Sequence, residues 1–194
     1  MAIADLTIMG AGVFGLSAAW AALARGATVR VIDPGGVGAG ASGGIVGALC
    51  PFAPELWTPI KTFQLQALLE AEAFWAGVAA VGGVDPGYGR VGRIQPIMNE
   101  RGLGLAQERR AASKVLWRGQ AEWRVERAGQ PGPWMPESPT GWLIYDTLSA
   151  RINPAQACAS LAAAIRAKGG EIVTEGRQAG AVLWATGAAG LAAR

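Results

Sequence analysis

The chain has 194 residues, of which 51% are hydrophobic and 16% charged, and its formal net charge is +3. This length allows one domain or two small interleaved domains, and the composition excludes an intrinsically disordered chain. The basic residues are scattered along the sequence, so we expect no nucleic-acid partner, because nucleic-acid-binding proteins concentrate positive charge on one face.

Histidine and cysteine usage narrows the chemistry further. Histidine is absent, which excludes imidazole bases, Ser-His triads and His-ligated metals, and we expect no metal site. Cys50 and Cys158 lie far apart in no redox or metal-binding spacing, as expected of free thiols in a cytoplasmic protein. We expect no secretory signal, because the N-terminus has no basic region and its apolar stretch is broken by Asp5 and by glycines, and no transmembrane segment, because no apolar run reaches about 18 residues. Peripheral membrane contact stays an alternative, and the oligomeric state stays open.

Residues 6–32 predict a strand, a helix and a parallel strand. An apolar run that ends at glycine is typical of a buried strand, and the helical segment after it stops at Gly26. The second strand is rich in β-branched residues and stops at Asp33-Pro34. The three elements are expected at residues 6–9, 13–24 and 27–32. Their order and length indicate a βαβ unit.

The turn before the helix carries a glycine motif, Gly10-Ala11-Gly12-Val13-Phe14-Gly15. In a G-x-G-x-x-G, the first glycine permits the tight turn, the second lets the backbone approach a pyrophosphate, and the third allows close helix–strand packing. The helix N-terminus offers free N–H groups to the phosphates. Asp33, at the end of the second strand, can accept a hydrogen bond from a ribose hydroxyl, which disfavours NADP. The motif therefore predicts a dinucleotide site, but it does not separate FAD from NAD.

A glycine-dense loop follows at residues 35–47. A flexible linker would not be expected to end in the apolar residues Ile45, Val46, Ala48 and Leu49. We therefore predict an ordered loop that leads into a short buried helix.

The middle of the chain differs in composition, with more tryptophan, proline and charge. We expect a long amphipathic helix at 60–81, a kinked strand at 88–98, a second helix at 103–117, an irregular stretch at 120–135 and a strand at 141–146. The first helix is predicted to bury one stripe, namely Phe63, Ala67, Ala71, Phe74 or Trp75, and Val78. This block predicts a separate lobe outside the βαβ unit.

The last part of the chain returns to a helix–strand pattern. Asn153-Pro154 is a good helix start, a capping residue followed by proline at the first helical position, and the helix is expected to end near Lys168. Strands are expected at 171–174 and 181–185. The pattern indicates that the chain leaves the nucleotide-binding sheet near residue 50 and re-enters it near residue 150.

Three segments carry a resemblance to the D-amino-acid oxidase and glycine oxidase family of FAD-dependent oxidoreductases. The loop 38–47, with its Ala-Ser-Gly element, resembles the family's loop along the pyrophosphate and ribityl chain. The helix start at 151–154 is similar to the family's return to the FAD domain, and 181–188 resembles its later strand and Ala-Thr-Gly turn. The resemblance implies an α/β fold, a Rossmann-like FAD-binding domain with a parallel sheet, interrupted by a partial α+β substrate lobe. The domains are then 1–50 and 148–194 for FAD and 51–147 for the lobe.

The resemblance also implies the cofactor-binding residues. The glycines of the motif would hold the pyrophosphate, Asp33 the adenosine ribose, and the residues after Gly47 would lie close to the isoalloxazine. The full set is Gly10, Gly12, Val13, Phe14, Gly15, Asp33, Pro34, Ala41, Ser42, Gly43, Gly47, Ala48, Leu49, Thr186 and Gly187. Ser42 is also a candidate N-cap of a short helix.

The sequence departs from the family pattern in two places, and these departures restrict which residues can be given a role. Residues 175–180 lack a valine whose backbone meets the adenine in the family, and the family continues well beyond its Ala-Thr-Gly turn, so we expect an N-terminal portion or a shortened member. No catalytic residue can be carried over. Polar residues of the middle block are expected to be ordinary lobe residues rather than substrate contacts, namely Glu55, Lys61, Tyr88, Arg90, Arg93 and Tyr145.

The first functional hypothesis is an FAD-dependent oxidoreductase that oxidises an amino acid or related amine by hydride transfer to the flavin. The second is a dinucleotide-binding module or truncated remnant without turnover of its own. An NAD-dependent dehydrogenase is the third, and bound flavin would exclude it.

Overall fold

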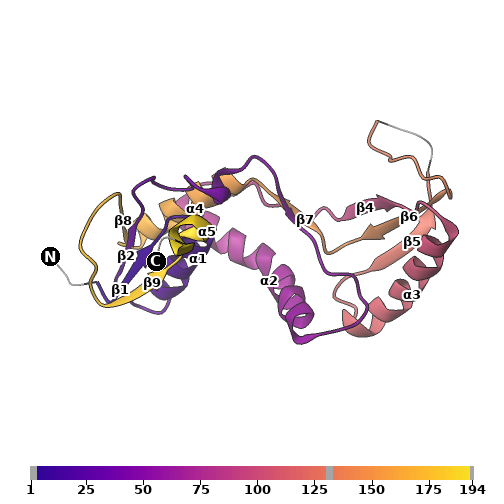
Figure 1. Cartoon of the computed structure of the whole chain (residues 1–194), viewed down its shortest axis with the longest axis horizontal. Helices are drawn as coiled ribbons and strands as arrows, with labels where there is room; N and C mark the ends of the chain where they lie inside the picture. Colours follow the sequence, from indigo (N-terminus) through magenta and orange to yellow (C-terminus); the bar gives the residue numbers. More distant parts are fainter. Residues whose placement is uncertain (1–3, 130–132, 193–194) are drawn as a thin grey trace. The chain divides into compact units, whose positions relative to one another are not determined.

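A computed structural model describes residues 4–129 and 133–192 (Figure 1). The chain divides into two compact units, of which the first contains Met1–Gly47, Ala73–Tyr88 and Ile152–Arg194 and the second Ala48–Glu72 and Gly89–Arg151. This division differs from the predicted one mainly at Ala73–Tyr88, which belongs to the first unit. The Ser160 hydroxyl donates a hydrogen bond to the Val84 carbonyl at 2.6 Å, which fastens this segment to the re-entering part of the chain.

The first unit is built on a four-stranded sheet in the order β8-β2-β1-β9 (Figure 1). Its strands are β1 (Leu6–Met9), β2 (Val29–Ile32), β8 (Glu171–Val173) and β9 (Ala181–Trp184). All three pairings are parallel, and Leu6 of β1 lies opposite Val29 on one side and Ala181 on the other. The predicted α/β class with a parallel sheet is therefore confirmed.

Helices α1 (Val13–Leu23), α4 (Pro154–Ala167) and the short α5 (Gly187–Ala192) belong to this unit. The core contains fully buried apolar residues from strands and helices, namely Ile8, Leu16, Val31, Leu161 and Ile165. The predicted start of α4 is confirmed, because the Asn153 side chain accepts a hydrogen bond from the Gln156 amide and proline follows at the first helical position.

The glycine-dense segment folds differently from the prediction. It contains a single 3₁₀ turn, η1 (Ala41–Gly43), followed by the strand β3 (Gly47–Leu49), which forms a two-stranded sheet with β7 (Ala150–Ile152). The expected short buried helix is wrong, and Ile45 and Val46 are 89% and 84% exposed. Pairing with a strand about a hundred residues later in the sequence determines the conformation of this segment.

The second unit has a three-stranded antiparallel sheet in the order β4-β6-β5 (Figure 1). Its strands are β4 (Arg93–Pro96), β5 (Trp123–Arg127) and β6 (Trp142–Asp146), and the helix α3 spans Glu100–Leu116. Its core contains large aromatic side chains. The buried rings of Trp117 and Trp123 contact each other edge to face, with centroids 6.2 Å apart. This is the α+β arrangement predicted for the middle block.

Helix α2 (Pro59–Gly82) is shared, with its first half in the second unit and its second half in the first. Its buried residues are Leu68, Trp75 and Val78, whereas the predicted stripe residue Phe63 is 69% exposed. The predicted stripe is confirmed at Trp75 and Val78 and is wrong at its first member, because apolar residues occur on several sides of the helix and Leu68 rather than Phe63 reaches the core of the second unit. Over residues 4–129 and 133–192, no helix is both long and apolar enough to cross a bilayer.

An ion pair in the second unit gives a pH-dependent contribution to stability. Arg109 binds both carboxylate oxygens of Glu55, with N–O distances of 2.9 and 2.6 Å. These hydrogen bonds hold the pKa of the Glu55 carboxyl below its usual value. A lowered folded pKa stabilises the fold above the ordinary glutamate pKa of about 4.3, and this contribution disappears as the pH falls through the lower folded value.

We therefore expect acid unfolding to distinguish the wild type from Glu55→Gln. At pH 7 the variant should be less stable by about 0.5–1 kcal/mol, since the pair is partly exposed, and the difference should shrink as the pH falls below about 4. Urea unfolding at several pH values measures this difference. A difference that stays constant with pH would show that the charge of Glu55 does not contribute.

Candidate cofactor-binding site

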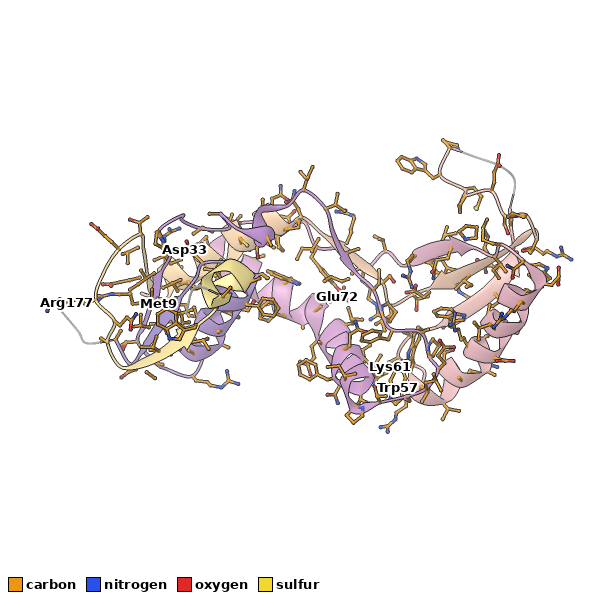
Figure 2. The ribbon with its side chains drawn as sticks, in the orientation of Figure 1. Met9, Asp33, Trp57, Lys61, Glu72 and Arg177 are labelled. Atoms are coloured by element: carbon orange, nitrogen blue, oxygen red, sulfur yellow. The ribbon has the colours of Figure 1, made fainter. Side chains whose placement is uncertain are left out.

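The candidate site lies at the carboxyl ends of β1, β2 and β9 in the first unit, where Figure 2 labels Met9 and Asp33. Gly10 makes the turn after β1 with φ +115°, a conformation that favours glycine. A methyl group at Gly10 would clash with the carbonyl oxygen of Ala185 and lie 3.1 Å from the amide nitrogen of Thr186. Gly10 therefore lets the β9–α5 turn lie directly against the end of β1.

The N-terminus of α1 forms the floor of the site. Gly12 is the N-cap in an extended conformation, and the helix begins at Val13. The N–H groups of Phe14 and Gly15 have no acceptor in the part of the chain that the structure describes, as is normal in a first helical turn. Gly15 packs against the backbone of Gly10 so closely that a side chain would not fit. The arrangement presents backbone donors and the positive end of the helix dipole.

Asp33 holds the glycine turn in place. The Ala11 amide donates to Asp33 Oδ2 at 2.7 Å, and the Gly35 amide donates to Oδ1 at 2.9 Å. Each carboxylate oxygen keeps a second lone pair, so the half-buried side chain can still accept a hydrogen bond from a ribose hydroxyl. Its neighbour Pro34 is exposed.

The turn η1 brings Ala41, Ser42 and Gly43 to the same place. The Val13 amide donates to Ser42 Oγ at 3.0 Å, so Ser42 caps α1 from a distant loop. Below the loop, the buried Cys158 thiol donates to the Ser42 carbonyl at 3.7 Å, and burial raises the pKa of this thiol. The predicted capping role of Ser42 thus applies to α1 rather than to a helix after the loop.

The β9–α5 turn adds Thr186 and Gly187. The hydroxyl of Thr186 is buried and has no hydrogen-bond partner among the described residues. A buried hydroxyl without a partner is uncommon in folded proteins. The cofactor cradle, as we name it, consists of Gly10–Gly15, Asp33, Ser42 and Thr186.

The remaining predicted residues lie in β3. Gly47 belongs to the first unit, whereas Ala48 and Leu49 belong to the second, where Leu49 packs against the apolar core. The sequence interpretation missed Ala11 and Gly38, although the Gly38 amide donates to the Ala11 carbonyl at 2.9 Å and joins the loop to the glycine turn. Nothing in the spacing of these residues indicates this contact.

Five of the six polar residues named for the middle block lie in the second unit, whereas Tyr88 lies in the first. Arg90 donates to the carbonyls of Thr147 and Gln120, and Lys61, labelled in Figure 2, contacts the carbonyl of Ala53. Arg93 pairs with Asp146 at 3.1 Å. Within 4–129 and 133–192, no group of three or more acidic or cysteine side chains could hold a metal ion.

The cradle fits the pyrophosphate and ribose of a dinucleotide. The donors are backbone N–H groups at a helix N-terminus, and the acceptor is a carboxylate at the end of the second strand. The buried hydroxyl of Thr186 next to them has no hydrogen-bond partner among the residues that the structure describes.

Removing the Ser42 hydroxyl tests the link between the loop and α1. We expect Ser42→Ala to destabilise the chain by about 1 kcal/mol, because the Val13 amide loses its acceptor. The affinity for FAD should fall by about fivefold, since the first turn of α1 and the loop are no longer joined. Urea unfolding and quenching of flavin fluorescence measure the two effects. Ser42→Thr keeps the hydroxyl and serves as the control, and equal behaviour of both variants would refute this role.

Comparison with known proteins assigns the family. Residues 5–192 match the model of the DAO family, described as FAD dependent oxidoreductase. The tRNA 5-methylaminomethyl-2-thiouridine biosynthesis bifunctional protein MnmC of Idiomarina loihiensis is 34% identical over 122 residues, which cover 61% of this chain and 19% of that protein.

Solved structures show the same fold. Glycine oxidase from Geobacillus kaustophilus has a TM-score of 0.72 at 21% identity, over 95% of this chain and 55% of that one. L-Amino acid deaminase from Proteus myxofaciens has a TM-score of 0.70 at 20% identity, over 95% of this chain and 44% of that one. The chain thus spans about half the length of these two enzymes. Together with the match over residues 5–192, these findings show that the chain belongs to the DAO family of FAD dependent oxidoreductases.

Proposed function

We propose that this chain forms the FAD-binding part of an oxidoreductase that oxidises an amino acid or a related amine. Membership of the DAO family supports the reaction class, and glycine oxidase and L-amino acid deaminase share the fold. The observation that carries the proposal is the cofactor cradle, in which Asp33 and Ser42 hold the glycine turn and the start of α1. FAD, when bound, supplies a hydride acceptor for a substrate C–H bond.

The residues of the cradle would divide the work of binding. The N–H groups of Phe14 and Gly15 would donate to the pyrophosphate oxygens, and Asp33 would accept from the adenosine ribose. The hydroxyl of Thr186 would donate to a phosphate oxygen, which would give this buried group a partner. In this proposal the first unit is the FAD domain and the second is part of a substrate lobe.

The relative MnmC favours a second substrate class. Its name places it in the biosynthesis of 5-methylaminomethyl-2-thiouridine in tRNA, and it is 34% identical to this chain over 122 residues. An amine attached to a tRNA nucleoside is therefore a candidate substrate beside free amino acids. We also propose a cytoplasmic location, supported by the two free cysteines, Cys50 and Cys158.

The test begins with cofactor binding by the 194-residue chain. Titration with FAD should quench flavin fluorescence with a dissociation constant in the micromolar range or below, ADP should compete, and NAD should bind at least about tenfold more weakly. Tighter binding of NAD than of FAD would overturn the cofactor assignment. Reduction of bound flavin by glycine, by D- or L-amino acids or by modified tRNA would then distinguish the substrate classes. Binding without reduction by any of them would favour a module without turnover.

A further inference from the structure

The second unit contains a cavity of about 390 Å³ between the C-terminal half of α3 and β5. Three of its eight lining residues are cationic. Arg110 and Lys114 come from α3 and Arg124 from β5, while Glu122 is the single acidic residue of the lining. The net charge of the lining is therefore +2.

Arg110 and Lys114 stand one helical turn apart and are both exposed. Like charges at this spacing repel each other. Neither side chain has an ionic or hydrogen-bonding partner among the residues described, whereas Arg109, beside them on the same helix, pairs with Glu55. Their position near the end of α3 favours positive charge, because the helix dipole is negative there. Two cations thus lie close together without a counterion from residues 4–129 or 133–192.

Arg124 completes the positive lining. Its guanidinium lies over the ring of Tyr145, 4.5 Å from the centroid, which orients the planar group. Glu122 contacts Arg124 at 3.4 Å and neutralises only this one of the three cations. The exposed Arg118 adds positive charge beside the lining residue Gly119, and it adopts φ +49°, where glycine is usual after a helix.

We propose that this cavity binds a phosphate group, carried either by a small molecule or by a single-stranded RNA. An RNA ligand would depart from the expectation drawn from the scattered basic residues of the sequence, because the fold gathers Arg110, Lys114 and Arg124 in one lining. A phosphate monoester carries a charge of about −1.5 to −2 at pH 7, and two neighbouring phosphodiesters of an RNA strand together carry about −2, so either matches the net charge of the lining, whereas one carboxylate would leave half of it unneutralised. Arginine guanidinium groups also match phosphate oxygens geometrically. The site belongs to the second unit and uses no residue of the cofactor cradle, so it goes beyond the proposed function.

The experiment compares two double variants of the 194-residue chain, which change the net charge equally. Arg110→Gln with Lys114→Gln removes cations of the cavity. The control is the double variant Arg101→Gln with Arg166→Gln. It removes two exposed cations that lie outside the lining and likewise lack ionic partners among the described residues. Excess FAD is present throughout to fill the cradle. Inorganic phosphate is titrated by calorimetry, and a fluorescein-labelled single-stranded RNA by anisotropy, in phosphate-free buffer.

We expect the wild type and the control to bind at least one probe with a dissociation constant of about 1 mM or below, and the cavity variant to bind it at least about tenfold more weakly. If RNA is the ligand, log K should fall less steeply with log salt concentration in the cavity variant. The slope should be smaller by about 1.4, because each of two lost phosphate contacts contributes about 0.7. If only inorganic phosphate responds, the ligand is a small molecule.

Equal affinity of the wild type and the cavity variant would overturn the site, and so would an equal loss in both double variants. Thermal unfolding followed by circular dichroism is used to check that both variants are folded. The two double variants test anion binding at α3 whether or not the chain retains FAD. Failure of anion binding and failure of FAD binding are therefore separate results.

Discussion

Gly10→Ala is expected to lower the free energy of unfolding of the first unit by about 2–4 kcal/mol and to abolish FAD binding. Gly10 has φ +115°, which an alanine adopts only under strain. The added methyl group would also clash with the carbonyl of Ala185, so the β9–α5 turn would have to move away from the end of β1. Urea unfolding and flavin fluorescence quenching measure both consequences.

Two other glycines provide matched controls. Gly26 has φ +85° but open space around it, so Gly26→Ala should cost only the strain, about 1–2 kcal/mol. Gly44 has an ordinary extended backbone, with φ −61° and ψ 165°, and a methyl group there would make only an ordinary contact at 3.8 Å, so Gly44→Ala should be close to neutral. Both controls should retain FAD. A loss in Gly10→Ala no larger than that in Gly26→Ala would show that the contact with Ala185 is unimportant.

Asp146→Ala is expected to destabilise the second unit by about 2–3 kcal/mol. Asp146 is fully buried at the end of β6, where Oδ1 accepts from the Ser149 amide at 2.7 Å and Oδ2 lies 3.1 Å from Arg93 Nε. Alanine leaves the amide without its acceptor and the partly buried guanidinium without its counterion. Because the Arg93 side chain is 32% exposed, water offsets part of the loss.

Tryptophan fluorescence during urea unfolding measures this effect, since Trp117 and Trp123 lie in the core of the second unit. Glu122→Ala removes an acidic residue just before β5, and its exposed pair with Arg124 at 3.4 Å should contribute no more than about 0.5 kcal/mol. If the Asp146 and Glu122 variants were equally stable, burial of Asp146 would not be responsible for its contribution.

The elements that could be predicted are those whose signals are local. The strand at 6–9, the helix after the glycine turn and the helix that begins after Asn153 each carry their own start or stop residues, and the structure places them within a few residues of the prediction. The strand β3 could not be predicted, because its three residues form a strand only by pairing with β7. Periodicity also failed to show that α2 is divided between two units and buries different residues in each.

In the candidate site, too, the features that could be predicted are the local ones. The glycine spacing and the position of Asp33 are local features, and they were sufficient to predict a dinucleotide site. The contact of Ser42 with Val13 and the approach of Thr186 to Gly10 join segments that are far apart in the sequence, so spacing could not reveal them. The family resemblance supplied Ser42 and Thr186 as candidates, and the structure adds the contacts that they make.

The strand order of the first sheet has a consequence for folding. β1 is made first but lies between β2 and β9, and β9 follows it by more than 170 residues in the sequence. During synthesis at about 5–20 residues per second, β1 and β2 can pair early, while the other edge of β1 waits for the whole second unit to emerge. Such non-local pairing makes folding slow, because a long loop must close before the strands gain contact. The nascent chain therefore carries an open strand edge until β9 has been synthesised, a period in which chaperones would protect it.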